Sequence, residues 1–205
     1  MASVDPDWRD GFLFVGNHLC LDFVNTQPVM NGQPVELLSG WKALLRWFRA
    51  ADLVSAKEMD TFVRQWEKRP DTEASLEGLK TLRESLRATV LRLEAGEEPA
   101  SRAVTELNRL LRAHPMFTEL HRIGGGLERR NLFELRRPDD LVAPIADAAA
   151  ALLSELNRAR LRKCECCVLH FHDTSKNGAR RWCSMQICGN RSKVAAYAKR
   201  RSSGQ

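Results

Sequence analysis

A cluster of metal-binding side chains near the C-terminus constrains this chain more than any other feature. Positions 164 to 188 contain five cysteines and two histidines: Cys164, Cys166, Cys167, His170, His172, Cys183 and Cys188. A tetrahedral zinc ion needs four ligands, and pairs a few residues apart bring two sulfurs to one side of the metal. Cys164 and Cys167 form a C-x2-C pair, and Cys183 and Cys188 form a C-x4-C pair. The spacing therefore predicts zinc held by these four sulfurs.

The other members of the cluster leave alternatives open. Cys166 can pair with Cys164 in a less usual C-x-C arrangement, and either histidine can replace one sulfur. His170 and His172 share one face of a strand, and we favour a solvated or hydrogen-bonded strand face over ligation. A metal-dependent nuclease using His170, His172 and Asp173 is a weaker alternative. Because four bound sulfurs leave no position for water, we expect a structural zinc ion and no enzymatic activity.

Charge divides the sequence into two parts. Residues 1–157 carry 20 basic and 24 acidic side chains, whereas residues 158–205 carry 12 basic and 2 acidic ones. The chain has no apolar run of about 18 residues and no signal peptide, so we expect a cytoplasmic protein without a membrane span. Clustered cysteines in that reducing compartment favour metal binding over disulfides. Cys20, in an apolar run far from the cluster, is expected in the core.

Residues 161–205 are predicted to form a zinc-bound finger resembling a treble clef. Asn177-Gly178 indicates a hairpin between the two cysteine pairs, and a basic helix follows Cys188. On that helix we expect Val194, Tyr197 and Ala198 to face the finger's core. Basic side chains predicted to contact nucleic acid are Arg180, Arg181, Arg191, Lys193, Lys199 and Arg200. The charge favours duplex DNA as the partner, and a protein or RNA partner is the alternative.

Residues 1–160 are predicted to form a mostly helical domain, so the chain is mainly α with a small β component. Apolar periodicity indicates helices over 35–50, 55–66, about 76–95 and 101–113, and a hairpin around Gly124–Gly126. Ser55 and Glu58 form a capping box. An alanine-rich helix after Pro138 is expected to run directly into the cysteine cluster. Segment 12–28 fits either a strand or a helix.

Polar residues in the N-terminal domain suggest two roles. Asn17, Asp22 and Asn25 lie among apolar neighbours, where capping of helices is the favoured interpretation. The functional interpretation is a small-molecule effector site that also includes Arg83. Sequence alone does not decide between an effector-sensing domain and one that forms a homodimer.

Three motifs resemble a known family. Cys188-Gly189-Asn190-Arg191, the preceding "RRWCSM" and the N-terminal "GNHLCLDFVNT" are similar to CGNR zinc-finger proteins with an ABATE domain. The resemblance implies a bacterial stress-induced transcription regulator with a DNA-binding finger, and implies the same four cysteine ligands. Family members often space the first ligand pair more widely.

The name-giving tetrapeptide also has physical interpretations. Gly189 can allow a tight turn beside a ligand sulfur, and Asn190 can cap the following helix. Arg191 can reach a phosphate or a guanine edge, or it can brace the zinc loop, and the sequence favours neither role.

Overall fold

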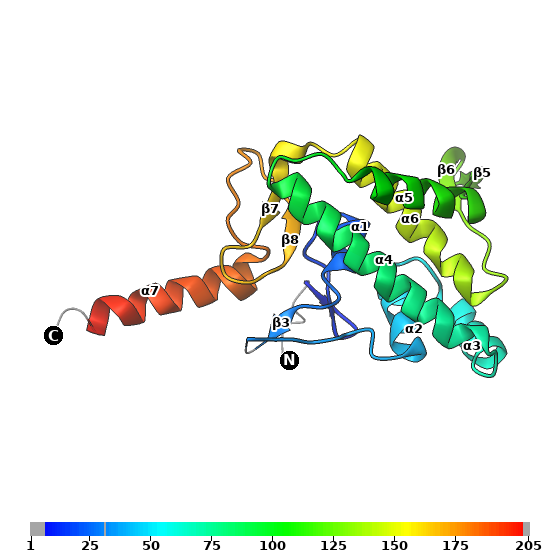
Figure 1. The fold of residues 1–205 in the computed structure, drawn as a ribbon, viewed down its shortest axis with the longest axis horizontal. Coiled ribbons are helices and arrows are strands. Elements are labelled where there is room, and N and C mark those ends of the chain that lie inside the picture. The colour runs from blue at the N-terminus through cyan, green and yellow to red at the C-terminus, as the bar shows by residue number, and fades with distance from the viewer. Residues whose placement is uncertain (1–6, 31, 203–205) are drawn as a thin grey trace.

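The computed structural model describes residues 7–30 and 32–202, which are mainly α-helical with short hairpins (Figure 1). The helices are α1 (Leu19–Val24), α2 (Trp41–Ala50), α3 (Ala56–Trp66), α4 (Asp71–Glu94), α5 (Ser101–Ala113), α6 (Val142–Ser154) and α7 (Asn190–Ser202). Shorter helical turns are η1 (Pro138–Leu141), η2 (Arg158–Arg160) and the π-helical η3 (Met185–Gly189). The predicted fold class is confirmed.

The strands that the structure describes pair only as two-stranded antiparallel sheets. The pairs are β1 (Trp8–Arg9) with β2 (Phe12–Leu13), β3 (Val29–Met30) with β4 (Gln33–Pro34), β5 (Phe117–Ile123) with β6 (Gly126–Leu132), and β7 (Leu161–Lys163) with β8 (His170–His172). The ambiguous N-terminal segment therefore contains both a strand, β2, and a helix, α1. No helix in the described ranges has the length and apolar character needed to cross a membrane.

Aromatic and leucine side chains from α1, α2, α4 and α6 form the main core. Trp47 is fully buried, and its ring centroid lies 5.4 Å from that of Phe23 and 5.3 Å from that of Phe48. Burying such side chains stabilises the fold by about 1.5–3 kcal/mol each. Cys20 is fully buried in this core, as predicted.

Local side-chain contacts decide where the helices begin and end. The predicted capping box is present, since the Ser55 hydroxyl accepts from the Glu58 N–H and the Glu58 carboxylate accepts from the Ser55 N–H. The helix predicted from residue 35 begins only at Trp41, because the Glu36 carboxylate accepts the Leu38 N–H in a preceding turn.

The predicted continuous helix into the cysteine cluster is wrong. Helix α6 ends at Ser154, and the Asn157 side chain accepts from the N–H of Ala159 to open η2. Strand β7 then begins at Leu161. The two predicted domains are thus joined by a turn, which allows β7 to fold back toward α4.

The turn predicted at Asn177-Gly178 lies in a loop and does not pair two strands. The Asp173 carboxylate accepts the N–H groups of Ser175 (2.9 Å) and Arg180 (2.8 Å) and closes this loop. Gly178 has a φ of +61°, which glycine adopts without strain. The hairpin of the finger is instead β7 with β8, in which Leu161 pairs with His172 and Lys163 with His170.

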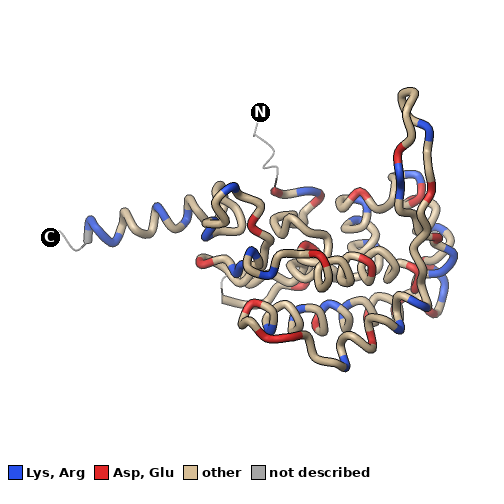
Figure 2. The backbone as a smooth tube through the Cα atoms, turned by 90° about the horizontal axis from the view of Figure 1, so that it is seen from above, with Lys and Arg blue, Asp and Glu red and all other residues tan. Residues whose placement is uncertain are grey.

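Two elements project from opposite ends of the molecule. Helix α7 extends from the finger, and the predicted hairpin β5–β6 extends from the far end of the helical part (Figures 1 and 2). Basic side chains recur along α7, whereas the hairpin carries both signs of charge (Figure 2).

Candidate metal centre and the helix that follows it

Four cysteine sulfurs meet next to η3. The Sγ atoms of Cys164, Cys167, Cys183 and Cys188 all lie within 4.8 Å of one another. Cys183 Sγ is 3.6 Å from the Sγ atoms of both Cys167 and Cys188. A disulfide would need about 2 Å, whereas Zn–S distances of about 2.3 Å place tetrahedral ligand sulfurs about 3.8 Å apart. The sulfurs that the spacing singled out therefore fit a metal ion of the zinc type.

Two short segments position the sulfurs. The first pair lies in the turn between β7 and β8, where the Cys164 N–H donates to the Leu169 carbonyl oxygen at 2.9 Å. Of the second pair, Cys183 precedes η3 and Cys188 lies within it; the Ser184 hydroxyl accepts from the Ile187 N–H, and the Ser184 carbonyl oxygen accepts from the Cys188 N–H at 3.0 Å. Each segment brings two sulfurs to one side of the site.

The thiols alter one another's ionisation. Hydrogen bonds with Cys167 and Cys183 lower the pKa of Cys164, whereas the hydrogen bond with Cys164 raises the pKa of Cys183. Burial raises the pKa of Cys188. The cluster can therefore carry several negative charges only beside a cation, and a divalent metal deprotonates the thiols that coordinate it.

The three alternative ligands lie outside this group of four sulfurs. Cys166 is half-buried and packs against the small core that contains the ligand cysteines. His170 is buried, and its Nε2 lies 3.1 Å from Glu94 Oε2 on α4. His172 shares the β8 strand face with His170, as expected. The carboxylate of Asp173, the third residue of the nuclease alternative, is hydrogen-bonded to backbone N–H groups of its own loop.

Arg180 and Arg181, two of the predicted nucleic-acid contacts, make contacts within the finger. The half-buried Arg180 donates to the carbonyl oxygens of Trp182 and Cys183, and its guanidinium lies 4.7 Å from the Phe171 ring centroid. Arg181 is exposed but donates to both carboxylate oxygens of Glu165 at 2.7 and 2.8 Å. Arg180 therefore braces the second cysteine pair, and the structure does not place it on an outer basic surface.

Helix α7 is exposed on all sides, which corrects the predicted packing of its apolar residues. Val194 and Tyr197 are 68% and 57% exposed, and Ala198 is exposed as well. The other four predicted nucleic-acid contacts, Arg191, Lys193, Lys199 and Arg200, are also exposed. The helix continues directly from η3 and projects away from the rest of the described chain, so none of the described elements covers it (Figure 1).

Gly189 and Asn190 of the CGNR tetrapeptide act differently from their predicted roles. Ser184 provides the cap, and Asn190 already has helical φ and ψ. Gly189 lies inside η3, where a Cβ would overlap the sulfur of Met185. Arg191 is exposed and pairs with no acidic group among the residues that the structure describes. Arg180, rather than Arg191, therefore braces the zinc loop.

Two family models match the sequence and confirm the resemblance. ABATE, described as "Putative stress-induced transcription regulator", matches residues 17–155, and the CGNR zinc finger matches residues 160–201. The chain belongs to the ABATE family. A search of curated proteins gives no match. The four-cysteine group lies within the segment matched by the CGNR finger.

The start of the ABATE domain holds β8 of the CGNR finger along its outer edge. The Asn25 side chain donates to the His170 carbonyl oxygen (2.8 Å) and accepts from the His170 N–H (3.0 Å). The His172 N–H donates to the Gly16 carbonyl oxygen (2.8 Å), and Asn17 Nδ2 donates to the His172 carbonyl oxygen (2.9 Å). We call Gly16, Asn17 and Asn25 the clasp, because together they satisfy the backbone of β8 as a third strand would.

The clasp is reinforced from both sides of the interface. His170 reaches Glu94 at the end of α4, and burial lowers the pKa of this histidine. From the N-terminal segment that precedes the ABATE match, Leu13 and Val15 pack into the small core around the cysteines. Sequence reasoning missed Glu94, because nothing local to either residue indicates a pair 76 positions apart.

Asp22 fixes the conformation of the clasp from within. Its Oδ1 accepts the Gly16 N–H at 2.7 Å, and burial raises the pKa of this carboxyl to about 7. A Cβ at Gly16 would lie 2.8 Å from Leu21 Cβ and 2.9 Å from the Asp22 nitrogen, so a side chain does not fit there.

The residues predicted as an effector site are not gathered in one cavity. Asn17 and Asp22 line a cavity of about 250 Å³ with Arg9. Arg83 is buried and donates to the carboxylate oxygens of Glu36 at 2.8 and 2.5 Å and to Thr26 Oγ1 at 3.0 Å. Asn25 is engaged with β8. The described contacts of the four residues are therefore with the fold itself.

Proposed function

We propose that this ABATE-family protein is a zinc-dependent, DNA-binding transcription regulator without enzymatic activity, and that α7 contacts the DNA. The exposure of α7 carries the proposal. This helix has five basic residues, no acidic residue and no buried face in its described part: Arg191, Lys193, Lys199, Arg200 and Arg201 are its basic side chains. Thirteen residues make a helix of about 20 Å, and the DNA major groove accepts a helix of that diameter.

The metal has a structural role in this proposal. Zinc bound by Cys164, Cys167, Cys183 and Cys188 would hold the turn between β7 and β8 against η3. It would thereby fix the direction of α7. Four sulfurs fill a tetrahedral shell, which supports a closed site without a position for a substrate or water. The clasp would hold the finger on the ABATE domain and leave α7 projecting away from it (Figure 1).

Duplex DNA binding of the zinc-loaded protein across a salt series tests the proposal. The plot of log K against log salt concentration has a negative slope, and each lost phosphate contact makes this slope shallower by about one. We expect the double substitution Arg191→Ala/Lys193→Ala to weaken DNA binding and to make this slope shallower by about two. Zinc removal by a chelator should abolish specific binding.

A matched control removes the same charge elsewhere. Arg64 and Lys68 are exposed basic residues on and after α3, which lies at the opposite end of the molecule from α7 (Figure 1). Arg64→Ala/Lys68→Ala should leave both affinity and salt slope unchanged. An equal loss of DNA affinity in the two double variants would mean that binding depends only on the total charge of the protein and not on α7. If the folded, zinc-loaded protein does not bind duplex DNA but binds RNA or a protein through α7, the alternative of a protein- or RNA-interaction module would be favoured.

A further inference from the structure

The β5–β6 hairpin has no part in the proposed DNA contact and is open to solvent on both faces. Its seven-residue strands pair with each other and with no third strand in the described ranges. Four of its large apolar side chains are exposed, namely Phe117, Leu120, Ile123 and Leu127. A two-stranded hairpin is marginally stable in water, and clustered exposed apolar groups mark interaction sites.

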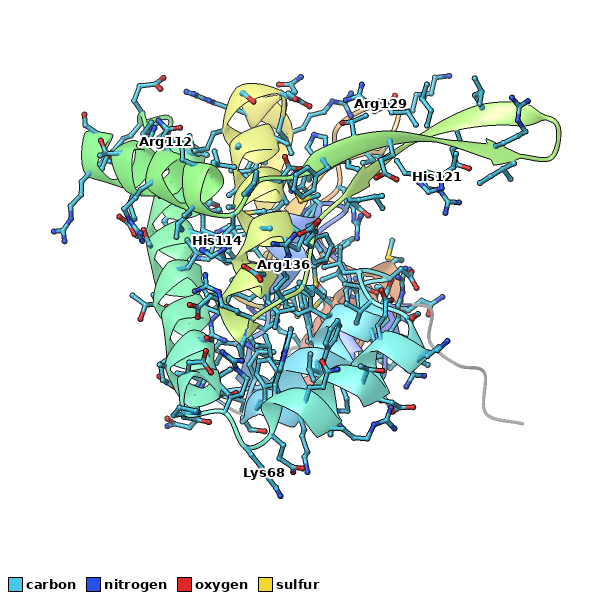
Figure 3. The ribbon with its side chains drawn as sticks, turned by 90° about the vertical axis from the view of Figure 1, so that its right-hand side faces the viewer. Lys68, Arg112, His114, His121, Arg129 and Arg136 are labelled. Carbon is cyan, nitrogen blue, oxygen red and sulfur yellow. The ribbon has the colours of Figure 1, made fainter. Side chains whose placement is uncertain are left out.

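The register assigns the side chains of the hairpin to two different faces. Because directly paired residues share a face, His121 and Glu128 lie on one face, and Leu120 and Arg129 lie on the other. Figure 3 shows His121 and Arg129 on opposite sides of the ribbon. On the His121 face, Glu128 forms an ion pair with Arg130 at 3.2 Å, and a Glu119 carboxylate oxygen lies 3.2 Å from His121 Nε2, so the arginine of this face already has an acidic partner.

The opposite face carries two leucines and two arginines, and we call it the Leu-Arg face. Leu120 pairs with Arg129, and Arg122 pairs with Leu127, so the leucines occupy one diagonal and the arginines the other. Leu120 and Leu127 are 67% and 63% exposed. Neither arginine has an acidic partner among the described residues. This face therefore offers apolar contact and uncompensated positive charge side by side.

We propose that the Leu-Arg face binds an acidic, leucine-containing segment of a partner protein. Leucines of such a segment would cover Leu120 and Leu127, and its carboxylates would accept hydrogen bonds from Arg122 and Arg129. A second copy stacked on the same face would bring four arginines together, which opposes self-association. Residues 117–132 contain three arginines and two glutamates, so their excess positive charge is far smaller than that of α7 and disfavours DNA.

The probe is a fluorescent peptide of alternating glutamate and leucine, titrated with the full-length zinc-loaded protein. We expect saturable binding that weakens about tenfold or more in Arg122→Glu/Arg129→Glu and in Leu120→Ser/Leu127→Ser. The control Glu128→Ala/Arg130→Ala removes an ion pair from the opposite face and should bind normally. If charge reversal disturbs the hairpin, Arg122→Gln/Arg129→Gln decides by the same criterion.

Several results would overturn the proposal. One is that the peptide does not bind. Another is that a peptide with lysine in place of glutamate binds as tightly, and a third is that the control variant loses as much affinity as the variants of the Leu-Arg face. A dimer in sedimentation experiments that Leu120→Ser/Leu127→Ser dissociates would assign the face to a second copy. Weaker duplex DNA binding by the arginine variants would assign it to DNA. Arg191→Ala/Lys193→Ala should bind the peptide normally, so this proposal and the DNA proposal can fail separately.

Discussion

The buried carboxyl group of Asp22, which contacts the clasp, should make the stability of the protein depend on pH. The carboxyl is 8% exposed and accepts the Gly16 N–H, yet burial raises its pKa from 3.8 to about 7. The folded state therefore binds a proton that the unfolded chain has released between these two values. Raising the pH through this window lowers the free energy of unfolding, by about 4 kcal/mol at most.

Asp22→Asn should remove this pH dependence. Asparagine keeps an oxygen for the Gly16 N–H and does not titrate, so the variant should gain stability relative to the wild-type protein between pH 5 and pH 8. Denaturant unfolding of both zinc-loaded proteins at the two pH values measures the difference. The cysteines titrate equally in both proteins and cancel in this comparison. A stability difference that is the same at both pH values would place the Asp22 titration outside this range.

Secondary-structure elements could be predicted where periodicity and caps are local. Helix α5 and the β5–β6 turn lie where apolar spacing and glycines place them, and Ser55 opens α3. Errors arise where a side chain competes for the backbone. Glu36 delays α2, Asn157 helps to separate α6 from β7, and Asp173 closes the Asn177-Gly178 loop. Periodicity carries no information about these contacts.

Two glycine-to-alanine substitutions should have opposite effects. At Gly16 the new methyl group would meet Leu21 and the Asp22 backbone, so we expect a loss of about 1–3 kcal/mol in unfolding free energy. At Gly78, inside α4, nothing lies within 4 Å of the Cβ position, and alanine should stabilise by about 0.5–1 kcal/mol. Thermal and denaturant unfolding measure both. Unchanged stability in Gly16→Ala would show that the approach of α1 does not require glycine at this position.

The four-cysteine site could be predicted from the sequence, whereas the attachment of the finger could not. Ligand spacing is a local property, so Cys164, Cys167, Cys183 and Cys188 stand out in one segment. The clasp joins Asn25 to His170 across 145 positions, and no local pattern shows that pair. The exposure of α7 was missed for a related reason. Val194 and Tyr197 suggest a buried face, but the direction of the helix out of η3 decides their exposure.

The clasp should couple the ABATE domain to zinc binding. Asn25 contacts the folded finger, and only the folded finger gathers four sulfurs, so a weaker clasp must weaken zinc affinity. Asn25→Ala leaves both the buried N–H and the carbonyl group of His170 without this partner, which costs about 2 kcal/mol or more.

We therefore expect zinc affinity to fall about tenfold or more in Asn25→Ala, measured by competition with a chromophoric chelator. Asn131→Ala, on the exposed β6 strand, is the matched control and should bind zinc normally. Unchanged affinity in Asn25→Ala would mean that the finger folds around its metal independently of the ABATE domain. A loss confined to Asn25→Ala would mean that the two parts form one cooperative unit, because the domain that carries no ligand then contributes to holding the metal.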